Sequence, residues 1–411
     1  MDSKSGAPIG RRADSGGQLT LLAQANASSR STDDRLLPAV GEKDVGKRVR
    51  RPIICILTSA KKNSDSFRGN RANFRDICRA GDRLGLTVVV STPAGLQSRR
   101  KMDCFLYTGD RLAPWRRATL PLPDVVYNRV PDREAERRSE VIKVKKWLAK
   151  REIPLFNERF YNKAEIHRWL ESERETSRYL PASELLQKEA QISQMLKKQH
   201  LVYLKPVDGK AGEGIVQIRT EGKGYRVTMQ KKGARTSARA SSRHEAAELS
   251  YRALGGRPSL IQQGVRLASY GGRPFDLRLL LQKDGRGMWD VTGIGARIAD
   301  ADGITTHVPN GGQIENADQV LSTAFGKARA GRIEQSVRRM ALAIAATIEQ
   351  KSAGAGHTGE MSMDIGVASD GSLYFFEANA KPMKFDEPTI RAKSLRRLLA
   401  YCKYLAAHPV S

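Results

Sequence analysis

Cysteine and long apolar runs are both scarce in this chain of 411 residues. The four cysteines, Cys55, Cys78, Cys104 and Cys402, lie far apart and include no C-x-x-C pair. This spacing suggests neither a zinc cluster nor a disulfide framework, and it favours a reducing compartment. No apolar run approaches the roughly 20 residues of a membrane helix, and the N-terminus lacks the basic start and apolar stretch of a signal peptide. We therefore expect a cytoplasmic protein without a membrane span.

Acidic residues are outnumbered, because 71 lysines and arginines stand against 44 aspartates and glutamates, for a formal net charge of +27. Residues 1–51 hold ten of the basic and six of the acidic residues, so most of the surplus belongs to the rest of the chain. Such a charge attracts polyanions, and nucleic acid is one candidate. Aromatic residues make up only 6%, and no zinc-finger or RNA-binding strand signature is present. The composition therefore disfavours specific nucleic-acid binding and favours phosphorylated or acidic ligands.

The chain divides into a leader and several folded parts. Residues 1–51 are rich in Ser, Gly, Ala, Asp and Arg without apolar periodicity, which is typical of a disordered leader. Residues 52–160 alternate apolar runs with helical stretches, which predicts a small α/β domain. We expect a second unit over residues 161–265, a third over 266–403, and a tail over 404–411.

Local patterns predict elements within the later units. Asn162 is a plausible N-cap for a helix that continues to residue 173. The other expected helices cover residues 182–198 and 332–351, with a basic helix closing the chain, and the expected strands include 259–265, 274–282 and 289–299. The stretch 231–243 is basic and contains no acidic residue. A solvated mobile arm and a ligand contact are both open for it.

The segment 363–382 predicts an antiparallel hairpin around Asp370-Gly371. Counting outward from a two-residue turn pairs Asp364 with Glu377 and Ser362 with Asn379 on one face. The other face is apolar and core-like, and we expect it to carry Ile365, Val367, Tyr374, Phe376 and Ala378. Directly opposite side chains lie about 5 Å apart, so the two carboxylates repel each other unless something offsets them. We expect a divalent cation to do so.

A glycine loop follows the apolar strand that ends at Lys205. In "KPVDGKAGEGI" the glycines Gly209, Gly212 and Gly214 allow backbone N–H groups to approach phosphate oxygens, and Lys205 adds a positive charge. The loop is not a P-loop, because G-x-x-x-x-G-K-[ST] is absent. A glycine-containing hairpin without function is the alternative.

Two arginines on neighbouring expected strands suit an anionic ligand. Asp276 and Arg278 share one face of the strand 274–282, for which a surface ion pair is the alternative, and Arg297 lies in the next strand. A planar guanidinium binds phosphate or carboxylate through two hydrogen bonds. The glycine-rich loop 307–313 follows and offers Asn310.

The order of these parts resembles the ATP-grasp fold. A lysine near a helix start, the Lys205 glycine loop, "LIQQGV", "DLR", "GAR" and the Asp364 hairpin occur in the family order over about residues 52–403. "GGRPFDLRLLLQK" and "DVVYNR" are similar to the YheC/YheD-like, endospore-coat-associated branch. The resemblance implies an N-terminal α/β domain, a small lid subdomain with the glycine loop, and a C-terminal metal-binding subdomain.

The resemblance also implies a role for each matched residue. The nucleotide phosphates would contact Lys163, Lys205 and the loop from Gly209 to Gly214, although Lys188 is an alternative to Lys163. The adenine would lie at Gln262, Gln263 and Val265. Arg278 and Arg297 would be the catalytic residues that hold the transferring phosphoryl group and the substrate. Mg²⁺ or Mn²⁺ would be ligated by Asp364, Glu377 and Asn379, an all-oxygen set that suits a hard cation.

The activity implied is an ATP-dependent ligase that joins a carboxylate to an amine or another nucleophile through an acyl phosphate. Its partners would be ATP, the two unidentified substrates and the spore coat. Positioning and charge stabilisation carry such catalysis, which agrees with the absence of a Ser-His-Asp or Cys-His arrangement. Two rivals stay open: a nucleotide-binding structural protein of the spore coat without turnover, and a basic nucleic-acid-binding protein.

Overall fold

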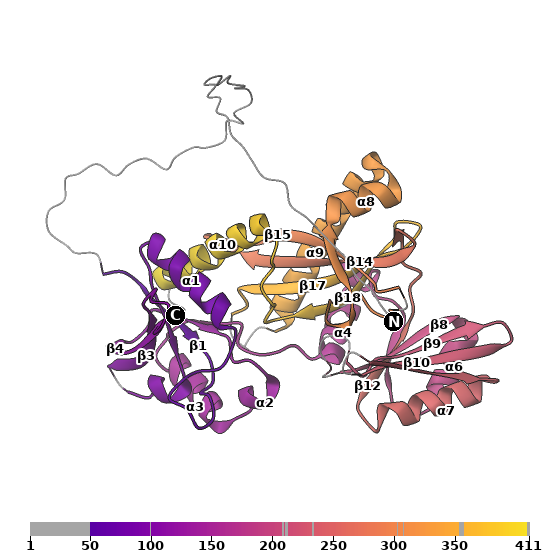
Figure 1. Ribbon diagram of the computed structural model, residues 1–411, viewed down its shortest axis with the longest axis horizontal. Helices are drawn as coiled ribbons and strands as arrows, with labels where there is room; N and C mark the ends of the chain where they lie inside the picture. Colours follow the sequence, from indigo (N-terminus) through magenta and orange to yellow (C-terminus); the bar gives the residue numbers. More distant parts are fainter. Residues whose placement is uncertain are drawn as a thin grey trace, which may run out of the picture. The chain divides into compact units, whose positions relative to one another are not determined.

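The computed structural model describes residues 50–408, apart from 99, 208, 210–212, 232–233, 302, 307 and 353–356. The predicted leader lies outside these residues, except for its last two positions. The described chain is a mixed α/β structure built on three β-sheets (Figure 1). Within it, every helix is too short or too polar to cross a membrane.

The first sheet combines four parallel strands with an antiparallel hairpin. Its spatial order is β4 (Trp115–Pro121), β3 (Lys101–Tyr107), β2 (Thr87–Ser91), β1 (Ile53–Leu57), β5 (Val125–Asn128) and β6 (Leu155–Phe156). The apolar runs correctly predicted β1, β2 and β5, whose residues are buried because helices cover both faces of the sheet. The hairpin of β3 and β4 was not predicted, since β4 is largely exposed and lacks an apolar run.

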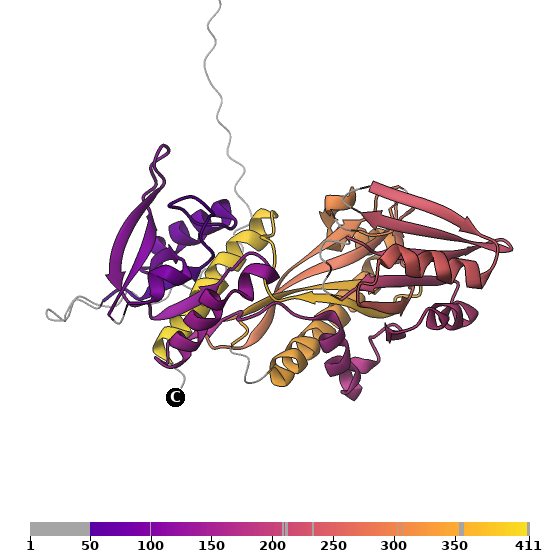
Figure 2. The ribbon, with the colours of Figure 1, turned by 90° about the horizontal axis from the view of Figure 1, so that it is seen from below.

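The C-terminal helix α10 (Pro388–Ala407) packs on this first sheet, far from it in sequence. Leu398, Leu399 and Cys402 belong to the same buried cluster as Ile54 and Ile56. Figures 1 and 2 show α10, in yellow, beside the indigo and purple strands. α10 also runs beyond residue 403, where we expected the tail to begin; the predicted domain boundaries stay a prediction.

The described residues also form nine further α-helices and two short 3₁₀ turns. They are α1 (Arg71–Arg83), α2 (Arg133–Glu136), α3 (Ser139–Ala149), α4 (Lys163–Glu171), α5 (Arg174–Ser177), α6 (Ala190–Lys198), α7 (Arg243–Leu254), α8 (Ala317–Phe325) and α9 (Lys327–Lys351), with the 3₁₀ turns η1 (Pro93–Leu96) and η2 (Val308–Asn310). The predicted N-cap of α4 is confirmed, because the Asn162 side chain accepts hydrogen bonds from the amides of Ala164 and Glu165.

The second sheet is antiparallel and carries the glycine loop. Its order is β11 (Ala234–Ala240), β10 (Gly224–Lys231), β9 (Val216–Glu221), β8 (Leu201–Pro206), β12 (Ser259–Gln263) and β7 (Ser183–Leu186). Helices α6 and α7 cover one face through a cluster that includes Ile192, Val202 and Ile261. The basic stretch after residue 231 contains the edge strand β11.

The helix expected over residues 182–198 is wrong in its first half. Residues 183–186 form β7 and pair with β12, and the helix begins only at Ala190. The Gln191 side chain accepts hydrogen bonds from the amides of Gln187 and Lys188, which satisfies donors just before the helix. Strand pairing of Ser183 to Leu186 therefore outweighed their helical propensity.

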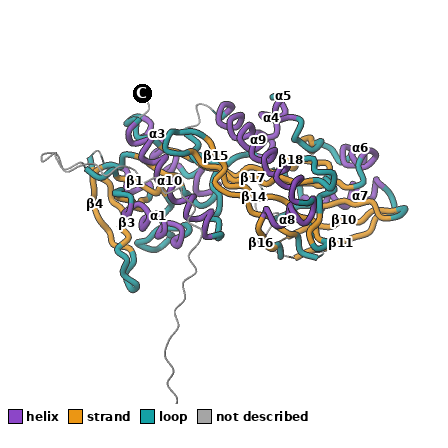
Figure 3. The backbone as a smooth tube through the Cα atoms, turned by 90° about the horizontal axis from the view of Figure 1, so that it is seen from above, coloured by secondary structure: helices purple, strands orange, loops and turns teal. Residues whose placement is uncertain are grey.

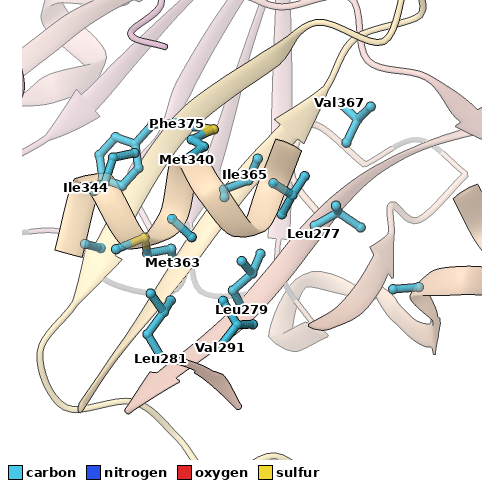
Figure 4. Packing of buried hydrophobic residues seen from close by; sticks show 14 of the residues in the cluster. Leu277, Leu279, Leu281, Val291, Met340, Ile344, Met363, Ile365, Val367 and Phe375 are labelled. Carbon is cyan, nitrogen blue, oxygen red and sulfur yellow. The ribbon is translucent and has the colours of Figure 1, made fainter. Parts of the chain in front are cut away.

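The third sheet has one apolar and one polar face. Its order is β16 (Gln313–Asn316), β15 (Trp289–Ile298), β14 (Arg273–Lys283), β17 (Glu360–Val367) and β18 (Leu373–Asn379), with β13 (Ser269–Tyr270) paired to β14. Helix α9 lies along the apolar face (Figure 3). There Met340 and Ile344 pack among Leu279, Met363 and Ile365 (Figure 4). The opposite face is left to the polar side chains.

Asn157, just after β6, joins the first sheet to the third. Its side chain donates to the carbonyls of Glu360 and Ala380 and accepts from the amides of Gly359 and Glu360, and the residue is 1% exposed. Its φ of 55° lies in the left-handed region, as does that of the exposed Asn63.

Replacing Asn157 with alanine should lower the free energy of unfolding by about 3–4 kcal/mol, because several buried backbone groups lose their partners. Asn63→Ala is the matched control, since it changes the same backbone conformation without those bonds, and should cost about 1 kcal/mol. Urea unfolding of both variants measures the difference. Equal losses would show that the Asn157 side chain contributes nothing beyond its backbone conformation.

Candidate functional site

The predicted pairing of β17 and β18 is confirmed, although the turn differs from the expected one. Asp364 pairs with Glu377 and Ser362 pairs with Asn379. The loop has three residues, because Ala368 pairs with Ser372, and Gly371 adopts a φ of 83°. A bulge between Asp364 and Ile365 then shifts the register by one. The two departures from the expected geometry cancel, so the two carboxylates still face each other.

Phe376 is the extra residue of this bulge, and its predicted place in the core was wrong. Phe375 belongs to the core instead. The Phe376 ring lies against Gly366, where an added Cβ would be 2.3 Å from the ring. Lys205 Nζ lies 5.2 Å from the centre of the same ring. Phe376 therefore contributes an aromatic wall to the polar face.

The two carboxylates are already neutralised by basic side chains in the protein alone. Asp364 Oδ1 lies 2.6 Å from Arg278, and Asp364 Oδ2 lies 2.8 Å from Arg297. Glu377 Oε2 lies 2.8 Å from Lys163 Nζ. Three basic residues from other elements therefore offset the repulsion between the two carboxylates in this structure, and the divalent cation expected beside them stays a prediction.

Asp276 fixes the position of Arg297 rather than pairing with Arg278 on its own strand. It accepts hydrogen bonds from Arg297 Nε at 2.9 Å and Nη2 at 2.6 Å, and from the Thr306 hydroxyl at 2.6 Å. Burial disfavours the charge of Arg297, but Asp276 and Asp364 outweigh burial and hold its pKa above the ordinary value. The surface ion pair considered for Asp276 is excluded, because its exposure is 4%.

Lys205 faces these carboxylates from the second sheet. Burial, with the nearby charge of Lys163, lowers the pKa of Lys205 to about 8. Its ammonium donates a hydrogen bond to Gln262 Oε1. Lys205 and Lys163 line a small cavity of about 30 Å³ together with Gln262, Phe376 and Glu377. Lys188, the alternative to Lys163, is exposed.

A larger cavity of about 810 Å³ adjoins the small one. Both are lined by His167 and Leu260, and the larger one extends between α4 and β7. His167 Nε2 is buried and has no hydrogen-bond partner among the described residues. No sequence pattern marks His167 as a site residue, because a single histidine on a helix has no informative spacing.

The glycine loop is only partly described, because Gly212 lies outside the described residues. The amide of Gly209 donates to the Pro206 carbonyl, and the amide of Gly214 donates to the Gln230 carbonyl. Gly214 has a φ of 76°, and an added Cβ would meet the Arg257 guanidinium at 2.4 Å. The amides of Gly209 and Gly214 therefore already have hydrogen-bond partners, and they can reach a phosphate only if the loop rearranges.

The residues expected at the adenine lie at the end of β12 and just beyond it. Gln262 bonds to Lys205 and Ser183, and Gln263 bonds to the amide of Ala182 through its side chain. Val265 lies just past the strand. Within the described part of the chain, its backbone N–H and C=O have no backbone hydrogen bond.

A buried carboxylate on β17 was missed by sequence reasoning. Glu360, 5% exposed, accepts hydrogen bonds from Tyr127 and from Gln282, and forms an ion pair with Arg129 at 3.4 Å. Glu360 lies on the same face as Asp364, four residues earlier. The sequence signal for Glu360 is the alternation of Glu360, Ser362 and Asp364, which lies on one face of the strand.

The chain belongs to the YheC/D-like ATP-grasp family, whose model matches residues 152–405. It is 32% identical to the endospore coat-associated protein YheD of Bacillus subtilis over 72% of this chain and 66% of the relative, just under two thirds of that protein. It is 20% identical to the endospore coat-associated protein YheC of the same organism over 71% of this chain and 80% of the relative.

Two solved structures with similar backbones are the following. VanG D-Ala:D-Ser ligase from Enterococcus faecalis matches with a TM-score of 0.48 and 10% identity, over 87% of this chain and 100% of the other. D-alanyl-alanine synthetase A from Vibrio cholerae matches with a TM-score of 0.47 and 10% identity, over 87% and 98%.

Proposed function

We propose that the polar face of the third sheet is the catalytic site of an ATP-dependent ligase. The observation that carries this proposal is the convergence of Lys163, Arg278 and Arg297 on the facing carboxylates Asp364 and Glu377. Alternating charges from separate elements form an electrostatic site that a polyphosphate and a cation can enter by exchanging partners.

Nucleotide binding would use both sheets. Lys163 and Lys205 would contact the phosphates, and the glycine loop would close over them after its amides change partners. The backbone groups of Val265, which have no backbone hydrogen bond to another described residue, would bind the adenine edge, beside Gln262 and Gln263. The cation–aromatic contact between Lys205 and Phe376 supports a wall between the phosphate and adenine parts of the site.

Asp364, Glu377 and Asn379 would hold Mg²⁺ or Mn²⁺. Two carboxylates and an amide make an all-oxygen set, and Ser362 Oγ, opposite Asn379, is buried without a hydrogen-bond partner among the described residues. The donors present therefore fit a hard cation better than zinc. When bound, such an ion supplies charge stabilisation to phosphate oxygens.

The arginines would act on the reacting groups. A substrate carboxylate oxygen attacks the γ-phosphorus, the bond to the β–γ bridging oxygen breaks, and ADP leaves. An amine or another nucleophile then attacks the acyl carbon, phosphate leaves, and the nucleophile loses a proton. Arg278 and Arg297 would stabilise the negative charge that develops in both steps, while Asp276 and Thr306 hold Arg297 in place.

The test is ADP release by the purified protein with Mg²⁺-ATP across pools of amino acids, peptides and cell extract. We expect at least one pool to raise ADP release at least tenfold above the rate without substrate. Nucleotide binding without ADP release in any pool would support the rival structural role. Binding of nucleic acid that disappears at high salt, with no affinity for ATP, would support the second rival.

The curated relatives are endospore coat-associated by name. We extend this association to the present chain as part of the proposal. Immunolabelling of spores would test it, and a signal confined to the cytoplasm of vegetative cells would contradict it.

A further inference from the structure

The second sheet carries a row of three arginines that the proposed catalytic site does not use. Arg219 on β9, Arg226 on β10 and Arg239 on β11 lie directly opposite one another. Arg219 is also opposite Leu201, four residues before Lys205 on β8. The row therefore lies on the same face as Lys205, about 13 Å away along the strands.

The positive charge of this arginine row is only partly balanced. Glu221 accepts a hydrogen bond from Arg226 Nε at 2.7 Å. Arg219 and Arg239 are exposed, and neither forms an ion pair with any carboxylate among the described residues. Like charges directly opposite each other across strands destabilise a sheet. An anionic group beside the row would relieve this repulsion.

The row ends at an open edge of the sheet. β11 pairs with β10 on one side, and in the part of the chain that the structure describes no strand pairs with its outer side. The neighbouring positions on this face already have partners. Ser237 bonds to Thr228, and Arg235 forms an ion pair with Asp300 at 2.9 Å. Arg239 is therefore the arginine on this edge that forms no ion pair with a described carboxylate, and the more distant charge of Glu221 acts on it.

Edge protection accounts for only part of the pattern. Charged side chains on an edge strand prevent pairing between sheets, which explains Arg239. It does not explain Arg219 and Arg226, because β9 and β10 are interior strands. The row of three opposing arginines therefore needs an explanation that includes the interior strands β9 and β10 as well as the edge strand β11.

We propose that an extended acidic peptide adds as a strand to the outer side of β11, with an aspartate or glutamate opposite Arg239. Main-chain hydrogen bonds to the open edge would supply affinity, and the arginine row would select an acidic side chain. On this face, the described residues of β9, β10 and β11 carry no aromatic side chain on which a base could stack, which favours peptide over single-stranded nucleic acid. This inference goes beyond the proposed ligase activity and requires neither ATP nor turnover.

The test uses labelled 12-residue peptides and the full-length protein without nucleotide. A peptide of alternating Thr and Glu should bind at least tenfold more tightly than one of alternating Thr and Gln, by fluorescence anisotropy. Arg239→Glu should weaken binding at least tenfold and Arg219→Ala about threefold. Arg243→Glu is the matched control, because it makes the same charge change on the exposed start of α7, which packs on the opposite face, and should change binding less than twofold.

Hydrogen exchange separates strand addition from simple charge attraction. The Thr-Glu peptide should slow amide exchange in residues 234–240 at least tenfold, and proline at the peptide positions whose N–H groups face β11 should abolish this protection. Unchanged exchange in β11, or equal losses in Arg239→Glu and Arg243→Glu, would overturn the proposal. So would binding of a 12-residue oligothymidylate with no binding of the Thr-Glu peptide. Because the assay contains no nucleotide, these failures are independent of the ADP-release result.

Discussion

Replacing Asp364 with asparagine should reduce substrate-dependent ATP turnover by about 100- to 1000-fold. The substitution keeps the shape of the side chain but removes the negative charge that Arg278 and Arg297 share, together with a carboxylate ligand for the cation. The free energy of unfolding should fall by about 2–3 kcal/mol, because charged hydrogen bonds at a buried residue are lost. Steady-state ADP release and urea unfolding measure the two effects.

Glu360→Gln provides the matched control for Asp364→Asn. Glu360 is a buried carboxylate on the same face of the same strand and also contacts an arginine. Its loss should destabilise the protein by a similar amount but lower ATP turnover less than threefold. Equal losses of turnover in the two variants would mean that Asp364 acts through stability alone.

Replacing Lys205 with methionine should weaken ATP binding by about 30- to 100-fold without lowering the melting temperature of the ligand-free protein. Burial disfavours the Lys205 ammonium, as its lowered pKa of about 8 indicates, so a neutral side chain of similar length removes that cost. A phosphate next to the ammonium stabilises it and adds a charge-assisted hydrogen bond.

The same lysine makes ATP affinity depend on pH. Bound phosphate stabilises the charged form and raises the pKa of Lys205, so binding above pH 8 requires uptake of a proton. Affinity should therefore be nearly constant below pH 7 and fall up to tenfold per pH unit above 8. Titration calorimetry in buffers of different ionisation enthalpy measures the proton uptake. Persistence of the full effect in Lys205→Met would assign it to another group.

The hairpin of the site could be predicted from sequence, because alternation of polar and apolar residues fixes which side chains share a face. The predicted two-residue turn was wrong, because the loop has three residues. The bulge at Phe376 compensates for this shift, so that Asp364 still pairs with Glu377. The place of Phe376 itself could not be predicted, since a bulge depends on packing against Gly366. The local sequence pattern thus predicts that the two carboxylates face each other, whereas the position of the Phe376 ring depends on tertiary contacts.

The ion pairs of the site were beyond sequence reasoning for a different reason. Arg297 binds Asp276 from a neighbouring strand, and Lys163 reaches Glu377 from α4. Such partners are set by the order of strands and the placement of a helix, which residue spacing does not encode. The strand β7 was missed because its four residues become a strand only by pairing with β12.

The most direct test of the proposed acyl-phosphate reaction is the identity of the nucleotide product. The purified protein is incubated with Mg²⁺-ATP, an activating carboxylate pool and hydroxylamine, and the nucleotides are resolved by chromatography. Attack on the γ-phosphorus predicts ADP, phosphate and a hydroxamate in equal amounts, with all three lost in Asp364→Asn. AMP and pyrophosphate would contradict an acyl phosphate, because they report attack on the α-phosphorus.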